Sequence, residues 1–177
     1  MTKTDIQNEF WLQYQKDWLN DDSLIKFWEK SRRIGATYVQ SYEDVRDCVT
    51  KRYFKKNRPL KVWFTSADLS AAKEYIDYCK EWATFFNSIA KDLGEVIIDE
   101  DKDIKALCLE FSNGARIFAL SSNPSQFRSK GGKVVIDEYA FHKDQKALWK
   151  AAFASARMWQ YPLRVLSTHN GQQCNFY

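Results

Sequence analysis

The alternation of apolar runs with helical stretches most constrains the fold of this 177-residue chain. β-prone runs recur along the sequence, and the segments between them carry apolar residues at helical spacing. The run Val134-Val135-Ile136 is apolar without alternation, as expected for a strand covered on both faces of a parallel sheet. The expected strands are residues 24–28, 60–65, 116–121, 133–136 and 163–167.

The segments between these runs predict helical crossovers. Residues 37–54 form one expected helix and residues 70–90 a longer one. Asn113-Gly114 separates β-prone runs at 105–111 and 115–120, which is a hairpin signal. The sequence therefore predicts an α/β three-layer sandwich with a mainly parallel central sheet and an antiparallel hairpin addition.

Composition sets broad limits on the class of protein. A hydrophobic content of 45%, with 16% aromatic residues, is ample for a buried core. The formal charge of +4 tolerates a polyanionic partner, yet 27 basic against 23 acidic residues is no dedicated nucleic-acid-binding composition. Charge alone therefore does not decide the function.

Cysteines and apolar segments bear on the compartment. The four cysteines are far apart without a C-x-x-C pair, and only His142 and His169 could join them around a metal, so free, mostly buried thiols are favoured over a zinc site. No apolar run suits a signal peptide or a membrane span. We expect one cytoplasmic domain over residues 1–177, with no membrane association.

Residues 30–37 leave a strand and open a helix, which is the context of a phosphate-binding loop (P-loop). Gly35 lets the backbone approach a phosphate closely, and Thr37 is placed to ligate Mg²⁺. The pattern departs from G-x-x-x-x-G-K-[ST], because Lys30 replaces the first glycine and Ala36 the usual lysine. A surface basic cluster is the alternative interpretation, although cations oppose the positive end of a helix dipole. The expected nucleotide-binding residues of this loop are Lys30, Ser31, Arg32, Arg33, Ile34, Gly35, Ala36 and Thr37.

Paired carboxylates follow the apolar run at 133–136. Asp137 is expected to hold Mg²⁺, and Glu138 to orient and deprotonate the attacking water. A solvated turn is the alternative, and Asp99-Glu100-Asp101 and Asp21-Asp22 are competing acidic sites. We favour Asp137-Glu138 because a new amphipathic stretch follows it, whereas residues 99–103 are a charged run typical of an exposed turn.

Two further segments are compatible with nucleotide chemistry. The strand at 163–167 leads into small polar side chains that could sense a γ-phosphate, or equally form a turn with a helix cap. Gln15 has an amide donor and acceptor that could read an adenine edge, although a glutamine on an amphipathic helix is usually only solvated. The residues expected to couple hydrolysis to movement are Ser167, Thr168, Asn170 and Gly171.

Taken in order, Gln15, residues 30–37, residues 134–138 and residues 167–171 resemble the ATPase domain of large terminase subunits of tailed phages, particularly the Mu-like branch. In that family a glutamine contacts adenine, a deviant P-loop can carry its lysine at the front, a strand ends in Asp-Glu, and a Ser-Thr-x-Asn-Gly coupling motif follows. The segments 64–68 and 122–132 also look like family loops.

The resemblance implies a three-layer P-loop NTPase of the RecA-like ASCE type that hydrolyses ATP with Mg²⁺ to drive double-stranded DNA into a procapsid. Lys30 would then hold the phosphates, and Arg32 would act as an in-chain arginine finger or sensor, with Arg33 and Arg128 as further candidates. The implied partners of the intact protein are a small terminase subunit and a portal, within a ring of identical subunits.

Two departures qualify the resemblance. His169 stands where the coupling motif often has proline. The family continues into a nuclease domain, so we expect this chain to be a fragment, monomeric by itself and truncated before the end of the ATPase domain. The alternatives are a helicase-like P-loop ATPase acting on DNA and a nucleotide-binding or DNA-binding scaffold without catalysis, the latter motivated by Ala36.

Overall fold

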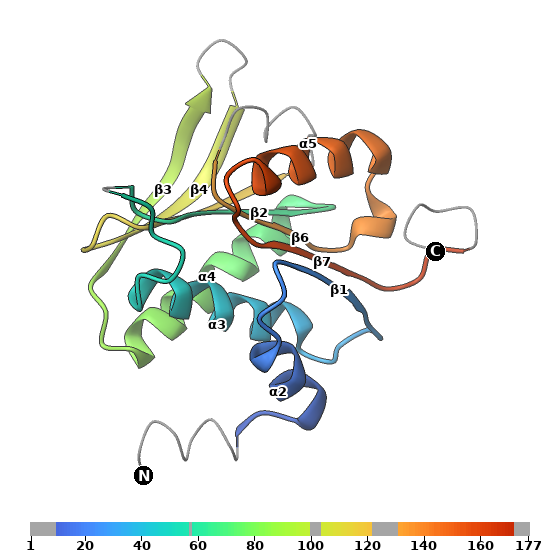
Figure 1. Ribbon diagram of the computed structural model, residues 1–177, viewed down its shortest axis with the longest axis horizontal. Helices are drawn as coiled ribbons and strands as arrows, with labels where there is room; N and C mark the ends of the chain where they lie inside the picture. Colours follow the sequence, from blue (N-terminus) through green and yellow to red (C-terminus); the bar gives the residue numbers. More distant parts are fainter. Residues whose placement is uncertain (1–9, 57, 100–103, 122–130, 172–177) are drawn as a thin grey trace.

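Seven strands form a single sheet in the computed structural model, which describes residues 10–56, 58–99, 104–121 and 131–171 (Figure 1). The strands are β1 (Ile25–Glu29), β2 (Lys61–Ser66), β3 (Ala90–Asp99), β4 (Ile104–Phe111), β5 (Arg116–Ser121), β6 (Lys133–Ile136) and β7 (Leu163–Ser167). Their spatial order is β1-β7-β6-β2-β5-β4-β3. Strands β1, β7, β6, β2 and β5 pair in parallel, whereas β4 and β3 extend the sheet antiparallel.

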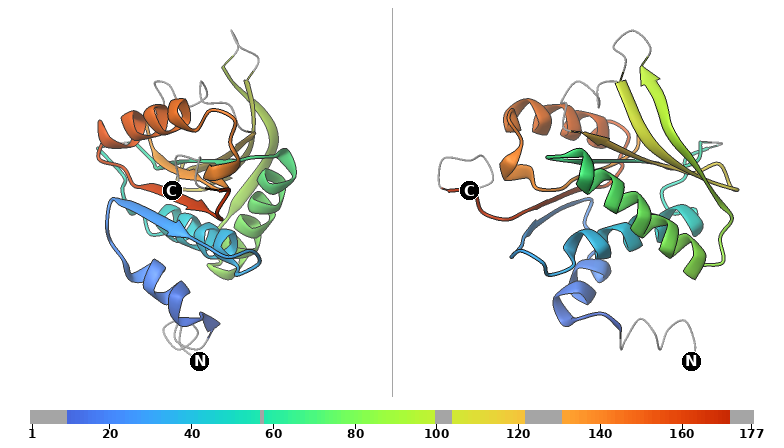
Figure 2. Two further views of the ribbon diagram at one scale, coloured as in Figure 1. Left: turned by 90° about the vertical axis from the view of Figure 1, so that its right-hand side faces the viewer. Right: turned by 180° about the vertical axis from the view of Figure 1, so that it is seen from behind.

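Helices cover both faces of the sheet, so the predicted three-layer α/β arrangement is confirmed (Figures 1 and 2). The helices are α2 (Gln13–Asn20), α3 (Ala36–Val49), α4 (Leu69–Phe85) and α5 (Gln145–Arg157), with a 3₁₀ turn, η2 (Tyr139–Phe141). Helices α3 and α4 lie on one face, with α2 packed beside α3, and α5 lies on the other face. None of these described helices is long and apolar enough to cross a membrane.

A hydrophobic core lies on each side of the sheet, which explains the apolar run of β6. Val135 contributes to the core beneath α3 and α4, whereas Val134 and Ile136 contribute to the core beneath α5. All three side chains are fully buried. The prediction of a strand covered on both faces is therefore confirmed.

The expected strands all form, but two helix ends were wrong. The helix expected to reach residue 54 ends at Val49, because Lys51 and Tyr53 take left-handed backbone angles (φ 57° and 61°) that a helix cannot contain. The helix expected to reach residue 90 ends at Phe85, and Asn87 (φ 50°) turns the chain into β3. Ala90 is thus the first residue of a strand.

Strand β3 was not expected, although its partner hairpin was. The turn at Asn113-Gly114 joins antiparallel β4 and β5 as predicted. Strand β3 is at the sheet edge and mostly half-exposed, so it lacks the apolar pattern of a buried strand. Gly94 (φ 65°) adjoins a register shift against β4 that further interrupts the pattern.

Three of the four cysteines, Cys48, Cys79 and Cys108, are free and buried as expected. Cys174 lies outside the described residues. Burial in apolar surroundings raises the pKa of the Cys48 and Cys79 thiols well above the usual value. These two groups are therefore held as neutral thiols inside the core.

Candidate functional site

The carboxyl ends of β1, β7 and β6 meet at one edge of the sheet. Glu29 of β1 is in register with Ser167 of β7, and Val165 of β7 with Ile136 of β6. The Lys30 amide also donates a hydrogen bond to the Ser167 carbonyl (2.9 Å). The P-loop, the acidic pair and the expected coupling segment are therefore neighbours, where parallel α/β folds bind their ligands.

The P-loop turns sharply before the first residue of α3. Arg33 (φ 59°) and Gly35 (φ 73°) both have left-handed backbones, and Gly35 caps the helix. A Cβ atom at Gly35 would lie 3.2 Å from Gln15 Nε2, so both its angles and its close neighbour favour glycine. Ser31 and Arg32 are exposed, and the first turn of α3 contains no acidic residue, so a helix N-terminus suited to an anion faces outward.

Lys30 reaches from this loop to the acidic pair. Its Nζ lies 2.6 Å from Glu138 Oε1 and 3.5 Å from Asp137 Oδ1. Burial would lower the pKa of Lys30, but the two carboxylates raise it above its ordinary value. Ala36, at the position of the usual lysine, is buried in the core, so Lys30 is the cation that the fold presents to the acidic pair.

Thr37 and Asp137 form the second link between the same segments. The Thr37 hydroxyl donates to Asp137 Oδ2 (2.6 Å), and the Glu138 amide donates to Asp137 Oδ1 (2.9 Å). Burial raises the pKa of Asp137, while Lys30 and the Thr37 hydroxyl oppose that shift. A hydroxyl and a carboxylate within hydrogen-bond distance are the oxygen ligands that Mg²⁺ prefers. The described residues contain no group of three or more His, Cys, Asp or Glu side chains that could hold a metal ion, so Thr37 and Asp137 supply only part of a coordination shell.

Glu138 points back toward the P-loop because its backbone is left-handed (φ 52°, ψ 42°). A non-glycine residue in this region costs about 1 kcal/mol or more, and such positions concentrate at functional sites. The side chain is partly exposed, with Lys30 on one oxygen and the Thr168 hydroxyl 3.4 Å from the other. Glu138 is therefore aimed at the space between the P-loop and β7.

The expected coupling segment contacts the turn that follows Glu138. The Ala140 amide donates to Ser167 Oγ (2.9 Å), and Asn170 Nδ2 donates to the Ala140 carbonyl (3.0 Å). His169 is exposed and pairs with Glu29, while Gly171 has a left-handed backbone (φ 76°). Both backbone groups of Ala140 are thus held by this segment.

Gln15 supports the P-loop directly. Its Nε2 donates to the Ile34 carbonyl (3.2 Å), where the Tyr14 hydroxyl also donates (3.1 Å), and its Oε1 accepts from the Leu12 amide (3.0 Å). The amide is therefore engaged with the backbone, with one N–H and one lone pair remaining for a base. Its proposed contact with adenine stays a prediction.

The remaining expected residues differ in their placement. Arg32 and Arg33 are exposed and form no ion pair with the described residues, so the arginine finger stays a prediction. Arg128 lies outside the described residues. The competing acidic site also fails to join the P-loop: Asp99 ends β3, at the opposite edge of the sheet from β1, and residues 100–103 are outside the described part.

His142, considered in the sequence only as a possible metal partner of the cysteines, is a neighbour of the site. His142 is buried, and its Nε2 lies 3.0 Å from the Asp137 carbonyl, which can only accept, so this nitrogen carries the hydrogen. Burial lowers the pKa of His142 and favours the neutral ring. Its position four residues after Glu138 was the available signal.

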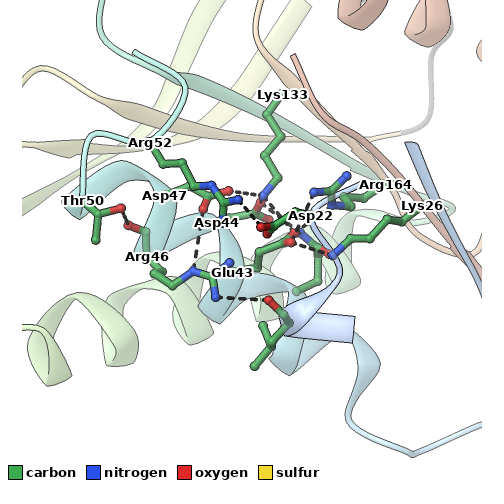
Figure 3. A network of polar contacts seen from close by, with 12 residues as sticks. Asp22, Lys26, Glu43, Asp44, Arg46, Asp47, Thr50, Arg52, Lys133 and Arg164 are labelled. Atoms are coloured by element: carbon green, nitrogen blue, oxygen red, sulfur yellow. Dashed lines mark hydrogen bonds and ion pairs between the residues drawn. The ribbon is translucent and has the colours of Figure 1, made fainter. Parts of the chain in front are cut away.

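A second cluster, here called the interior charge network, lies behind the site (Figure 3). It connects α3 to the same three strands that carry the site. Three acids of α3 face three cations, one from each of β1, β7 and β6, and all six side chains are buried. The acids are Glu43, Asp44 and Asp47, and the cations are Lys26, Arg164 and Lys133.

Contacts within this network are short. Lys133 Nζ lies 2.6–2.9 Å from a carboxylate oxygen of each of the three acids. Arg164 (3.0 Å) and Lys26 (2.8 Å) both pair with Glu43. Burial would raise the pKa of Glu43, but these cations hold it well below its ordinary value. The network therefore fixes α3, and with it the P-loop, against β1, β7 and β6.

The fold and this arrangement define a P-loop NTPase domain of the RecA-like type, and comparisons with known proteins narrow the class. Residues 28–177 match the family described as terminase large subunit, T4likevirus-type, N-terminal. The chain therefore belongs to this family, which is the N-terminal ATPase domain of large terminase subunits.

The chain is similar in sequence to proteins of phage Mu and of a Mu-like prophage. It is 41% identical over 165 residues to the Mu-like prophage FluMu protein gp28 of Haemophilus influenzae, covering 93% of this chain and 32% of that protein. It is 40% identical over 165 residues to the probable terminase large subunit gp28 of Escherichia phage Mu, covering 90% and 29%. The chain thus spans about a third of the length of these relatives.

Solved structures agree on the fold. The large terminase ATPase domain of Thermus phage P74-26 matches 97% of this chain and 71% of its own, with a TM-score of 0.66 and 11% identity. A large terminase of a thermophilic bacteriophage in complex with ADP matches 94% of this chain and 38% of its own, with a TM-score of 0.58 and 16% identity.

Proposed function

We propose that this chain binds Mg²⁺-ATP and hydrolyses it to drive double-stranded DNA into a viral procapsid. One observation carries the proposal: the P-loop and the acidic strand end lie in direct contact, through Lys30 with Glu138 and Thr37 with Asp137. Two relatives, the probable terminase large subunit gp28 of Escherichia phage Mu and the probable terminase ATPase subunit of Haemophilus phage HP1, support the same activity.

The residues present fit a magnesium nucleotide. The outward N-terminus of α3 and the exposed loop before it suit the phosphates. Thr37 and Asp137 would hold Mg²⁺, which supplies positive charge to the transferred phosphoryl group. Gln15 and Tyr14, which brace the loop at Ile34, would lie beside the adenine.

Lys30 has two competing partners in this proposal. It pairs with Glu138 in the structure, and a triphosphate on the loop would attract the same ammonium group. Transfer of Lys30 to the phosphates would leave the Glu138 carboxylate free to accept a proton from the attacking water. Arg32, exposed on the loop, would contribute charge at the leaving phosphate, within this chain or at a neighbouring subunit of a ring.

The coupling step would pass through Ala140. Thr168 contacts Glu138, while Ser167 and Asn170 hold the backbone of the turn that follows it. Loss of the γ-phosphate would change the charge beside Glu138 and shift this segment. In the intact protein the movement would act on DNA, with the small terminase subunit and portal as further partners.

The test is Glu138→Gln, with Glu95→Gln of the distant strand β3 as the matched control. ATP affinity is measured with and without Mg²⁺, and phosphate release is measured with DNA present. Glu138→Gln should bind ATP at least as tightly, because Lys30 loses a charged partner, while turnover falls by at least about 100-fold. Full turnover by Glu138→Gln would remove the assigned base, and failure of the parent protein to bind ATP would overturn the proposal.

A further inference from the structure

Three long segments of this chain contain no acidic residue, namely residues 48–67, 111–136 and 145–177, and the first and last of them meet in the fold. Residues 48–67 hold six basic residues and residues 145–177 hold four, and neither segment contains Asp or Glu. The rest of the chain therefore has six more acidic than basic residues, although the whole chain carries +4. The basic charge is concentrated rather than spread evenly.

Parts of these two segments, the connection before β2 and the turn after α5, meet at the end of the sheet opposite the nucleotide site. Arg58 lies over the Trp159 ring (5.6 Å to the centroid) and Lys55 over the Tyr161 ring (5.4 Å). The connection from α3 to β2 thus packs on the turn that follows α5. Figure 1 shows both at the left, whereas the ends of β6 and β7 that carry the site point right.

Helix α5 carries further basic residues along its outer face. Lys146, Lys150 and Arg157 are exposed and lie at spacings of four and seven residues, so they line up on one side of the helix. Leu148 and Ala152 occupy the opposite side and are buried against the sheet. The helix therefore turns an acid-free line of cations outward.

The cations of this surface are not neutralised locally. No described carboxylate forms an ion pair with Lys55, Lys56, Arg58, Lys146, Lys150 or Arg157. The acids at its borders are engaged elsewhere, since Asp22 pairs with Arg52 and Asp144 caps the N-terminus of α5. These six exposed residues are here called the basic surface.

We infer that the basic surface binds the phosphate backbone of double-stranded DNA. This inference rests on the proposed function, because it assigns the place where the DNA partner binds. Lysine supplies four of the six cations, and lysine is depleted in protein interfaces but suits phosphates as a flexible point charge. An extended, acid-free line of charges matches a polyanion read without sequence preference.

The test compares three double charge reversals, which change net charge equally. Lys146→Glu/Lys150→Glu and Lys55→Glu/Lys56→Glu alter the basic surface, and Lys73→Glu/Lys91→Glu is the control, with exposed lysines on α4 and β3. Binding of a fluorescent DNA duplex is measured by anisotropy over a series of salt concentrations. Each surface variant should lose about tenfold in affinity or more, and the slope of log K against log salt should fall by about two.

The control should lose much less affinity. Equal losses in all three variants would show an effect of overall charge and overturn the inference, as would no binding of DNA by the parent protein. Retained duplex binding with lost binding of polyglutamate by the surface variants would assign the surface to an acidic protein and also overturn it. ATP affinity, measured in parallel, should be unchanged in every variant; its absence in the parent protein would overturn the proposed ATPase while leaving the DNA surface standing.

Discussion

The candidate site and the interior charge network join the same elements, α3 with β1, β6 and β7, but they differ in burial and in balance. In the network, three cations match three acids and all are enclosed. In the site, Lys30 is the one cation of the described residues that pairs with Asp137 and Glu138, and Glu138 is partly exposed. The balanced, buried charges of the network therefore stabilise the packing of α3 on the sheet. In the site, Lys30 can exchange one partner for another, which leaves the site's charged groups available for chemistry.

Removal of a cation from the interior charge network should have the largest effect, a loss of stability. Lys133→Met leaves three buried carboxylates facing two cations, so the free energy of unfolding should fall by about 3–5 kcal/mol. Urea unfolding, followed by tryptophan fluorescence, measures the loss. Lys105→Met, at an exposed pair on β4, should change stability by less than about 1 kcal/mol. Equal small losses in the two variants would contradict a structural role for the network.

Removal of a hydroxyl from the candidate site should instead change ligand affinity and leave stability nearly unaffected. Thr37→Val keeps the side-chain shape but deletes the oxygen that bonds Asp137. The gain in ATP affinity that Mg²⁺ provides should fall by about tenfold, with roughly 1 kcal/mol or less of stability lost. Thr50→Val deletes a hydroxyl at the far end of α3 and is the control. A large loss of stability in Thr37→Val, without any change in the Mg²⁺ dependence of ATP binding, would show that Thr37 has a structural role instead.

The smallest effect separates two lysines of the network by pH. Burial lowers the pKa of Lys26 to about 8, whereas the three carboxylates hold that of Lys133 above its ordinary value. An unfolded lysine keeps its proton up to about pH 10.4. Between about pH 8 and pH 10.4, Lys26 therefore binds fewer protons in the folded state than in the unfolded state, whereas Lys133 does not. The contribution of Lys26 to stability should therefore rise with pH in this window.

This prediction is measured as a difference, because the buried thiols also titrate in the alkaline range. The stability of the parent protein relative to Lys26→Met should increase from pH 8 to pH 9.5 in urea unfolding experiments. The same comparison with Lys133→Met should stay flat, since Lys133 is protonated in both states there. A flat Lys26→Met difference would mean that Lys26 stays charged inside the network.

Much of the site was predictable because its residues follow strands in the sequence. Parallel strands place their carboxyl ends together, so residues 30–37, Asp137 and the 167–171 segment had to be close once the strands were recognised. The departure at Ala36 also had a local explanation, since Lys30 was the cation at the entrance of the loop. Chain order and strand chemistry were sufficient for this part.

The interior charge network was not predictable in the same way. Lys133 begins one apolar strand and Arg164 lies within another, and the sequence pattern assigned no role to either residue. Lys133 meets three acids of α3 that lie 86 to 90 residues earlier in the chain, and Arg164 meets Glu43, 121 residues earlier. These partners come together only when the helix packs on the sheet. Strand β3 was missed for a related reason, because its edge position removes the apolar pattern on which recognition depends.

The position of β1 at the margin of the sheet has a consequence for the P-loop it supports. Within the described residues β1 pairs with β7 alone, and Ile25 and Phe27 are exposed along it. A strand held from one flank is where local opening of a sheet costs least, and its unpaired backbone groups can accept another extended segment. Whatever occupies that flank would stiffen the strand leading into Lys30, so the affinity for the proposed nucleotide would depend on the sheet margin as well as on the loop.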